Sequence, residues 1–425
     1  MRCLNSRASL RMSEFRPPID NRAFMALCHW AIPAELWRAR IEVRVVGDGL
    51  ERLKKLRGKR STIVSNHGDQ FDPEVVFTLS KKMGEYFHFI AARECFDWVH
   101  GSVGWLFQNL GCYSVARGEA DIESFKMTQQ ILVHGQRKLV MFPEGEVTRQ
   151  PDRVLQLRKG AFRIFLEAQA QLNKEKPGEA LWVQPIGIRW KYRDDVMPRL
   201  HSAMRRIEKR LRILPPSRHI LDRVEFAAMT MANILEQEYN APERPELPFE
   251  RRIIALREHV LRAMALTLNV ALDEEQEHLD WFRHLNVALN NYVNADMRDR
   301  SDFQKRLHQE LAAKVERMRS DMVRMQHLIG ITEGDEYKAQ TPERIANKIA
   351  KIEREVIGHS TYKGVRVALV GVGEPISLLE YLPQFESDRD GAVDKLTDLV
   401  HGAIQSIVDN LESIQRTDYS ASLPR

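Results

Sequence analysis

The sequence predicts an α/β fold in which a mostly parallel sheet is flanked by helices, with a large all-α insertion before the last strand. Three observations predict it. Short β-type runs alternate with helical periodicity between Glu42 and Trp190. From Met197 to about Gly358 the chain is charged and helix-forming, and β-type runs are absent. They return at residues 364–376, before a last amphipathic segment.

The first part of the chain carries the strands of the predicted sheet. Valine, isoleucine and aromatic residues gather in EVRVVG, STIVS, YFHFIAA, GCYSVA, KLVMF and LWVQPIGIRW, each closed by Gly, Asn, Arg or Pro. Helical spacing of apolar residues separates several of these runs, as at residues 121–135 and 160–172. Strands that alternate with helices predict parallel pairing.

The last β-type run, GVRVALVGVGEPI, either starts a small third unit or completes the first sheet. We favour completion, because one strand and one helix cannot bury a core alone. The expected organisation is a disordered tail (1–20), the first part of the main domain (21–196), a helical insertion (197–360), the completing strand and helix (361–413) and a second tail (414–425).

Composition excludes several classes of protein. The chain has 425 residues, of which 43% are hydrophobic and 29% charged, as in globular proteins. A net charge of +5 is too small to indicate a nucleic-acid partner. The four cysteines lie far apart, without the paired spacing of a zinc site or a disulfide framework, which favours a reducing compartment.

The stretch STIVSNHGDQFDPEVVF places polar residues directly after a predicted strand. Asp72, followed by Pro73 and Glu74, is typical of a helix N-cap and first turn. His67 has no such explanation, and loops after parallel strands are where α/β sheets bind ligands. An aspartate within reach of a histidine orients the imidazole and stabilises the imidazolium. The stretch therefore contains a candidate catalytic pair.

Three further clusters end β-type runs. Arg117 follows GCYSVA, Glu144 and Arg149 follow KLVMF, and Pro185 interrupts LWVQPIGIRW, which suggests a strand edge or a bulge. If the strands are parallel neighbours, the charged side chains meet His67 and Asp72 at one edge of the sheet. Such a basic pocket would suit an anionic substrate with a hydroxyl group.

These blocks occur in the order found in one known family. Asn66, His67 and Asp72 form an HX4D motif, followed by 111–117, by FPEG at 142–145 and by Pro185. The sequence resembles the glycerolipid acyltransferases of the 1-acylglycerol-3-phosphate (lysophosphatidate) acyltransferase type. RKGAF at 158–162 and GEPI at 373–376 extend the resemblance, which covers about 21–192 and 364–411.

The resemblance implies a reaction and a set of roles. His67 would be the general base that takes the proton from an acceptor hydroxyl, and Asp72 would orient it. The hydroxyl would attack the thioester of acyl-CoA or acyl-ACP directly, without an acyl-enzyme and without another cofactor. A set of residues would bind the substrate: Asn66, Arg117, Glu144, Gly145, Arg149, Lys159 and Pro185. The pathway implied is phospholipid biosynthesis.

The motif after Glu144 departs from the family pattern. Glu146 and Val147 precede Thr148 and Arg149, so the arginine is displaced by two positions. An added acid beside a phosphate site is unfavourable. The acceptor therefore stays open between a lysophospholipid and another lipid, such as a sterol, a glycolipid or an amino-acid lipid. A non-catalytic lipid-binding scaffold that works through its helical insertion is the alternative from another class.

A lipid acceptor requires contact with a membrane, and the longest apolar stretch near the start, residues 24–37, is too short to span one. It lies where the family places an amphipathic helical hairpin. A basic segment with an apolar stripe at Met204, Ile207 and Leu211 is either a second membrane-surface helix or a packed one. We expect a peripheral protein on the cytoplasmic face of the membrane.

The helical insertion carries no decisive motif. Glu275 and His278 have the spacing of half a carboxylate-bridged metal site, but the second half is missing, so no metal is expected. The insertion is interpreted as a partner or homo-oligomer surface, or as a cover for an acyl channel.

Overall fold

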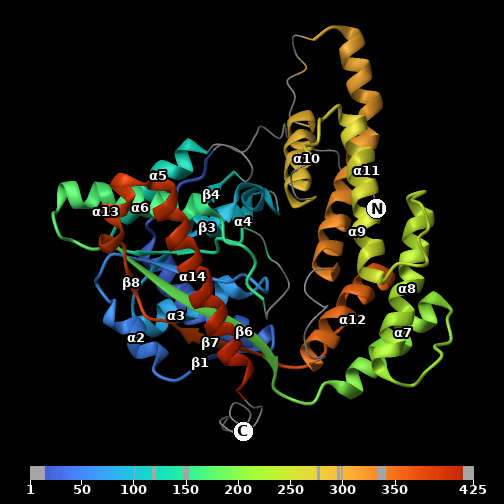
Figure 1. Ribbon diagram of the computed structural model, residues 1–425, viewed down its shortest axis with the longest axis horizontal. Helices are drawn as coiled ribbons and strands as arrows, with labels where there is room; N and C mark the ends of the chain where they lie inside the picture. Colours follow the sequence, from blue (N-terminus) through green and yellow to red (C-terminus); the bar gives the residue numbers. More distant parts are fainter. Residues whose placement is uncertain are drawn as a thin grey trace. The chain divides into compact units, whose positions relative to one another are not determined.

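The computed structural model describes residues 15–99, 101–116, 121–145, 147, 153–274, 278–293, 297, 300–332 and 341–414. The chain divides into two units (Figure 1). The α/β unit takes residues 15–196 and 364–414 of this described part, and the helical unit takes residues 197–363. In sequence, the helical unit is thus inserted between two parts of the α/β unit.

One eight-stranded sheet forms the centre of the α/β unit (Figure 1). Its order is β1-β7-β6-β2-β5-β3-β4, with β8 beside β6. All pairs are parallel except β6 with β7 and β6 with β8. The strands are Ile41–Val45 (β1), Ser61–Ser65 (β2), Phe87–Ala92 (β3), Cys112–Val115 (β4), Lys138–Met141 (β5), Trp182–Tyr192 (β6), Arg366–Val372 (β7) and Ile376–Ser377 (β8). The predicted α/β fold with a mostly parallel sheet is confirmed.

The chain that returns from the helical unit completes this sheet. β7 lies between β1 and β6, and its antiparallel ladder with β6 runs from Ile186↔Val372 to Tyr192↔Arg366. Pro185 lies just beyond that ladder, and its carbonyl accepts the Gly373 N–H at 3.0 Å. The proline therefore lies in the central strand β6, opposite the gap between its two antiparallel partners, β7 and β8. The alternative that it marks a sheet edge is wrong.

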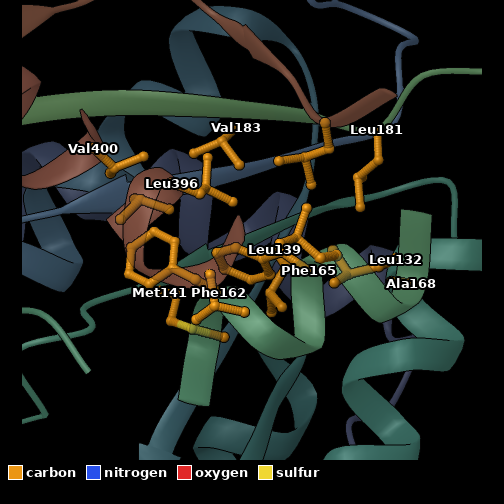
Figure 2. Packing of buried hydrophobic residues seen from close by; sticks show 14 of the residues in the cluster. Leu132, Leu139, Met141, Phe162, Phe165, Ala168, Leu181, Val183, Leu396 and Val400 are labelled. Atoms are coloured by element: carbon orange, nitrogen blue, oxygen red, sulfur yellow. The ribbon is translucent and has the colours of Figure 1, made fainter. Parts of the chain in front are cut away.

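Helices bury both faces of the sheet. The helical spacing of the sequence places apolar side chains on one side of each helix. Along a strand, neighbouring residues point to opposite faces, so Ile63 and Val64 lie in different cores. One core contains side chains of α5, α6 and α14 against β5 and β6, as Figure 2 shows for Phe162, Phe165, Leu139, Val183, Leu396 and Val400. The other core contains side chains of α1 to α3 against the opposite face.

The helices of the α/β unit follow the strands in the predicted alternation. They are Arg22–Arg38 (α1), Gly49–Lys55 (α2), Asp72–Met83 (α3), Arg93–Asp97 (η1, a 3₁₀ turn), Ser102–Asn109 (α4), Ile122–His134 (α5), Lys159–Glu175 (α6), Leu378–Tyr381 (η2), Leu382–Ser387 (α13) and Arg389–Glu412 (α14). Side-chain caps begin several of them: Asp121 accepts the Ser124 N–H at 3.1 Å, and Asp388 accepts the Gly391 N–H at 3.0 Å.

Close approach of α14 to the sheet depends on two glycines. A Cβ on Gly187 of β6 would lie 2.6 Å from Cγ2 of Ile407, and one on Gly371 of β7 would lie closer still. Both positions need hydrogen in place of a side chain, because the Ile407 side chain occupies the space. Helix α14 can therefore pack closely against β7, the strand that follows the helical unit.

Residues 15–20 cover the edge strand β4. Arg16 N–H donates to Oγ of Ser114 at 2.8 Å, and Ser114 N–H donates to the Arg16 carbonyl at 3.0 Å. These residues were expected to be disordered, but the exposed edge of β4 offers backbone groups that they satisfy. Residues 1–14 of the expected tail lie outside the described part of the chain, as do residues 415–425 of the second tail.

Helix α1 is one helix rather than the expected hairpin. It is capped by Asn21, whose Oδ1 accepts the Phe24 N–H at 3.0 Å, and it continues through Pro33. A proline inside a helix removes one backbone hydrogen bond and kinks or breaks the helix, and here the helix nevertheless runs on to Arg38. Across the described residues, no helix combines the length and the apolar character needed to cross a membrane.

The helical unit consists of α7 (Met197–Leu211), α8 (Ile220–Glu238), α9 (Phe249–Leu268), α10 (His278–Val293), α11 (Asp302–Thr332) and α12 (Pro342–Ile357). The apolar stripe of α7 is buried against α8 and α12, with Met204 and Ile207 inaccessible. The interpretation of this stripe as membrane-facing is wrong, and the packed helix is correct. Thr341 caps α12 by accepting the Arg344 N–H at 3.4 Å.

Candidate active site

Asn66 fastens the end of β2 to β6. Its Nδ2 donates to the Ile188 carbonyl at 3.0 Å, and its Oδ1 accepts the Ile188 N–H at 2.8 Å. The side chain is buried, and both its polar atoms are used by one backbone residue. Asn66 was predicted to bind substrate, whereas this geometry makes it a tether that sets where the next residue, His67, leaves the sheet.

His67 and Asp72 meet at the carboxyl end of β2. Nδ1 of His67 lies 3.1 Å from Oδ2 of Asp72. A carboxylate oxygen only accepts, so the ring hydrogen is on Nδ1 and the lone pair of the neutral imidazole is on Nε2. The ring stacks on Phe142 with centroids 4.4 Å apart, and 14% of the His67 side chain is exposed. The pair therefore presents an oriented, partly accessible base.

Asp72 is the first residue of α3, with Phe71 at the N-cap. Its carboxylate turns back: Oδ2 also accepts the Asp69 N–H at 2.8 Å, and Oδ1 accepts Nε1–H of Trp190 at 2.8 Å. The expectation that Asp72 caps the helix is wrong, because these donors take both oxygens. Burial raises the pKa of Asp72, and the hydrogen bond from His67 opposes that rise.

Glu144 lies at the carboxyl end of β5, the strand beside β2. Its Oε1 accepts the His67 N–H at 2.7 Å, and its Oε2 accepts the Leu155 N–H at 3.2 Å. Burial raises the pKa of Glu144 to about 7, while the two backbone hydrogen bonds act to lower it. The Glu144 carboxyl group therefore holds the backbone of the His67 loop, which follows β2, to the segment before α6.

Gly145 forms a turn that only glycine fits easily. Its φ is +79°, and an added Cβ would collide with the side chain of Arg158. Arg158 N–H donates to the Pro143 carbonyl at 2.9 Å, so the turn is joined to the start of α6. Gly145, which was predicted to bind substrate, thus shapes the turn that follows β5.

Two more of the predicted residues, Lys159 and Pro185, have partners away from the His67 loop. Lys159, the first residue of α6, has its Nζ 2.8 Å from Oδ1 of Asp394 on α14, and 58% of its side chain is exposed. Pro185 contributes its carbonyl to Gly373, as described above. Arg117 and Arg149 lie outside the described residues, as does Glu275.

Two residues beside Asp72 were not predicted. Trp190 alternates with Ile186 and Ile188 along β6, so its position indicates only a core side chain. Arg366 precedes the apolar run of β7, and its Nη1 lies 2.6 Å from Oδ2 of Asp69. No pattern near either residue marks the contact, because the partners are more than a hundred residues away in sequence.

The arrangement supplies general-base chemistry. A histidine with a buried carboxylate on Nδ1 takes a proton at Nε2, and the carboxylate stabilises the imidazolium. Within the described part of the chain, no group of three or more His, Cys, Asp or Glu side chains is placed to hold a metal ion.

One comparison with known proteins found a family for the region that contains this loop. A family model described as Acyltransferase matches residues 44–189, which include the end of β1, all of β2 to β5, most of β6 and the whole His67 loop. A search of curated proteins found no match to the chain.

Proposed function

Because residues 44–189 form an acyltransferase domain of the glycerolipid acyltransferase family, we propose that the protein transfers a fatty acyl group from acyl-CoA or acyl-ACP to a hydroxyl of 1-acylglycerol-3-phosphate or a related glycerolipid. The observation that supports this most directly is the 3.1 Å contact between Nδ1 of His67 and Oδ2 of Asp72. It lies inside the matched domain, at the sheet edge where α/β proteins bind ligands.

The proposed reaction uses His67 as the base. Its Nε2 takes the proton of the acceptor hydroxyl as the oxygen attacks the thioester carbonyl carbon. The tetrahedral intermediate then collapses, the C–S bond breaks, and the thiolate of the donor leaves and takes up the proton from the imidazolium. Base assistance of this kind contributes on the order of a hundredfold to ten-thousandfold. Asp72 keeps the imidazole oriented and offsets its charge.

The surroundings of the pair suit a fixed base. Glu144 holds the His67 backbone, and Asn66 holds the end of β2. The phosphate of an acceptor would need cations, for which the proposal relies on Arg117, Arg149 and Lys159. Lys159 is already paired with Asp394, so an acceptor phosphate would have to compete with that carboxylate.

We also propose that the protein docks on a membrane surface through α1. The exposed side of this helix is apolar between Arg22 and Glu35: Leu27 and Trp30 face outward, and 78% of Trp30 is exposed. Trp37 near the helix end is 81% exposed. Exposed tryptophans beside cationic residues are typical of helices that lie in the lipid interface. Trp105 on α4 is 58% exposed and contacts Phe24 of α1, so it enlarges this apolar surface. Trp98, which directly follows η1, is also exposed.

The reaction is tested with purified protein, a panel of lipid acceptors and both thioester donors. Free thiol and acylated lipid are measured together. We expect equal amounts of both products with one acceptor class, and loss of both in His67→Ala. The panel contains lysophospholipids, a sterol, a glycolipid and an amino-acid lipid, so it also identifies the acceptor. Absence of thiol release on every acceptor would instead favour the lipid-binding scaffold.

Docking is tested by flotation with anionic phospholipid vesicles. The variant Trp30→Ser with Trp37→Ser should shift most of the protein from the vesicle fraction to the soluble fraction. Leu266→Ser is the matched control, because Leu266 on α9 is 85% exposed but belongs to the helical unit. Equal flotation of all three proteins would contradict docking through α1.

A further inference from the structure

Trp190 contacts the carboxylate oxygen of Asp72 that His67 does not. Nε1–H of this indole donates to Oδ1 of Asp72 at 2.8 Å, while Oδ2 faces Nδ1 of His67. Both Asp72 and Trp190 are buried. Because each carboxylate oxygen has its own side-chain partner, the carboxylate cannot turn without breaking a hydrogen bond.

Trp190 is itself covered by Arg366. The guanidinium of Arg366 lies over the indole, with Cζ 4.7 Å from the ring centroid, and over Phe71 at 5.2 Å. Its Nη1 pairs with Oδ2 of Asp69 at 2.6 Å, and the Asp69 N–H donates to Asp72 at 2.8 Å. Arg366 therefore supports the catalytic carboxylate along two routes, through the indole and through the backbone of the loop.

We propose that Trp190 and Arg366 are positioning residues that hold the Asp72 carboxylate against His67. This inference rests on the proposed acyl transfer, in which His67 acts as the base. Both residues lie on strands that connect to the helical unit: β6 ends at Tyr192 and β7 begins at Arg366. The strand that returns from the helical unit thus brings a side chain to the catalytic loop, although the Acyltransferase match ends before it.

The charge of the pair gives the expected direction of the effect. Neutral His67 with ionised Asp72 carries one negative charge, and uptake of one proton makes the pair neutral. A donor on Asp72 stabilises the charged form more than the neutral form, so loss of the donor raises the apparent pKa of the pair, wherever the proton resides. Loss of the positive charge of Arg366 acts in the same direction. The other ionisable groups that face the pair are Asp69, Glu74 and Glu144.

The first test is Trp190→Phe, which keeps an aromatic ring but removes the donor. Trp182→Phe is the matched control, because Trp182 lies at the other end of the same strand. Acyl transfer is measured as a function of pH. We expect kcat to fall about tenfold in Trp190→Phe, with KM nearly unchanged. The apparent pKa of the acid limb of the pH profile should rise by roughly half a unit to one unit. The control should match the wild type.

The second variant, Arg366→Met, keeps an apolar chain over the indole but removes the charge. Its side chain is partly exposed, so the change is milder for folding. We expect the apparent pKa of the acid limb to rise in this variant too, but by less than in Trp190→Phe. If Trp190→Phe does not fold, this variant still tests the proposal.

A measurement without substrate separates this inference from the proposed function. In protein labelled with ¹⁵N-histidine, His67 is assigned by the signal lost in His67→Ala, and its titration is followed by NMR. The midpoint should rise in Trp190→Phe and Arg366→Met but not in Trp182→Phe. Unchanged midpoints and an unchanged acid limb in folded variants would overturn the proposal. Absence of transfer by the wild type, with shifted midpoints, would refute the acyl transfer and leave the positioning contacts standing.

Discussion

Four buried carboxylates, two in each unit, are held by different kinds of partner. In the helical unit, Glu236 is paired with Arg252, and Glu208 receives two hydrogen bonds from Arg223 at 2.7 and 2.8 Å. In the α/β unit, Asp72 and Glu144 are held by backbone N–H groups, an imidazole and an indole, none of which is a permanent cation. All four carboxylates are buried, but a cation neutralises only Glu236 and Glu208.

This difference separates structural from chemical roles. A buried ion pair can often be replaced by apolar residues of similar volume with little loss of stability. A buried carboxylate with neutral donors keeps a charge that no fixed cation cancels, and for Asp72 a proton taken up by the neighbouring His67 would offset that charge. The chemistry of the partners, rather than burial, therefore distinguishes the site from the helical core.

The largest expected effect comes from exchanging one carboxylate in each unit for an amide. Asp72→Asn keeps the size of the side chain but removes the charge that orients and stabilises His67. We expect kcat to fall by about a hundredfold to ten-thousandfold. Glu236→Gln should leave kcat unchanged at temperatures where the protein is folded. Both are measured as thiol release from the acyl thioester.

Equal losses of kcat in the two folded variants would contradict the distinction between the units. A loss in Glu236→Gln alone would place the chemistry in the helical unit. Circular dichroism of both variants at the assay temperature is the control for folding.

The next effect concerns the ion pairs of the helical unit. Arg252→Met leaves Glu236 buried without its cation and should destabilise the helical unit by about 3–5 kcal/mol. The double variant with Glu236→Leu should recover most of that loss, because no buried charge remains. Urea unfolding followed by circular dichroism measures both. A double variant as unstable as the single one would show that these residues contribute through packing instead.

Much of the fold could be predicted from the sequence because its signals are local. β-type runs and helical spacing located strands β1 to β6 and helices α5, α6 and α14, and the return of a strand after a long helical stretch indicated completion of the sheet. The apolar stripe of α7 shows the limit of such patterns. A stripe that faces a helix and one that faces a membrane have the same spacing, and only packing against α8 and α12 decides between them.

The candidate site could be predicted only in part, because sequence patterns are local and some of its contacts join distant residues. His67, Asp72 and Glu144 follow strands that a parallel sheet brings to one edge, so their proximity follows from topology. The functions of Trp190 and Arg366 depend on one indole N–H and one guanidinium meeting distant carboxylates. Both residues lie within or beside apolar strand runs, where the pattern indicates core packing and nothing more.

The two units should also respond to pH in opposite directions. The pKa of Glu144 is raised by burial to about 7, from about 4.5 in the unfolded chain. Its unfolded form releases the proton first, so this contribution to stability is complete below pH 4.5 and is lost as pH rises towards 7. Burial also raises the pKa of Glu74 to about 7, with the same sign.

The stability contribution of Glu353 in the helical unit changes with pH in the opposite direction. Burial alone would raise its pKa, but hydrogen bonds from Lys363, Thr361 and Arg206 lower it to about 2. Its contribution is therefore complete above about pH 4.5 and is lost as pH falls through about 2. We expect the urea midpoint of the α/β unit to fall between pH 5 and 7.5, and Glu144→Gln to reduce that fall. An identical pH profile in Glu144→Gln would contradict the assignment.

The smallest expected effect concerns the packing of α14 against β7, the strand that follows the helical unit. A Cβ on Gly371 would collide with Ile407 of α14, so Gly371→Ala should destabilise the α/β unit by about 1–3 kcal/mol. Gly402 lies within α14, with no atom within 4 Å of its added Cβ, so Gly402→Ala should stabilise by about 0.5–1 kcal/mol. Urea midpoints give both changes. Because the helical unit has no part in this contact, the unfolding of α7 to α12 should stay as in the wild type, and a matched shift of both transitions would mean that the two units unfold together.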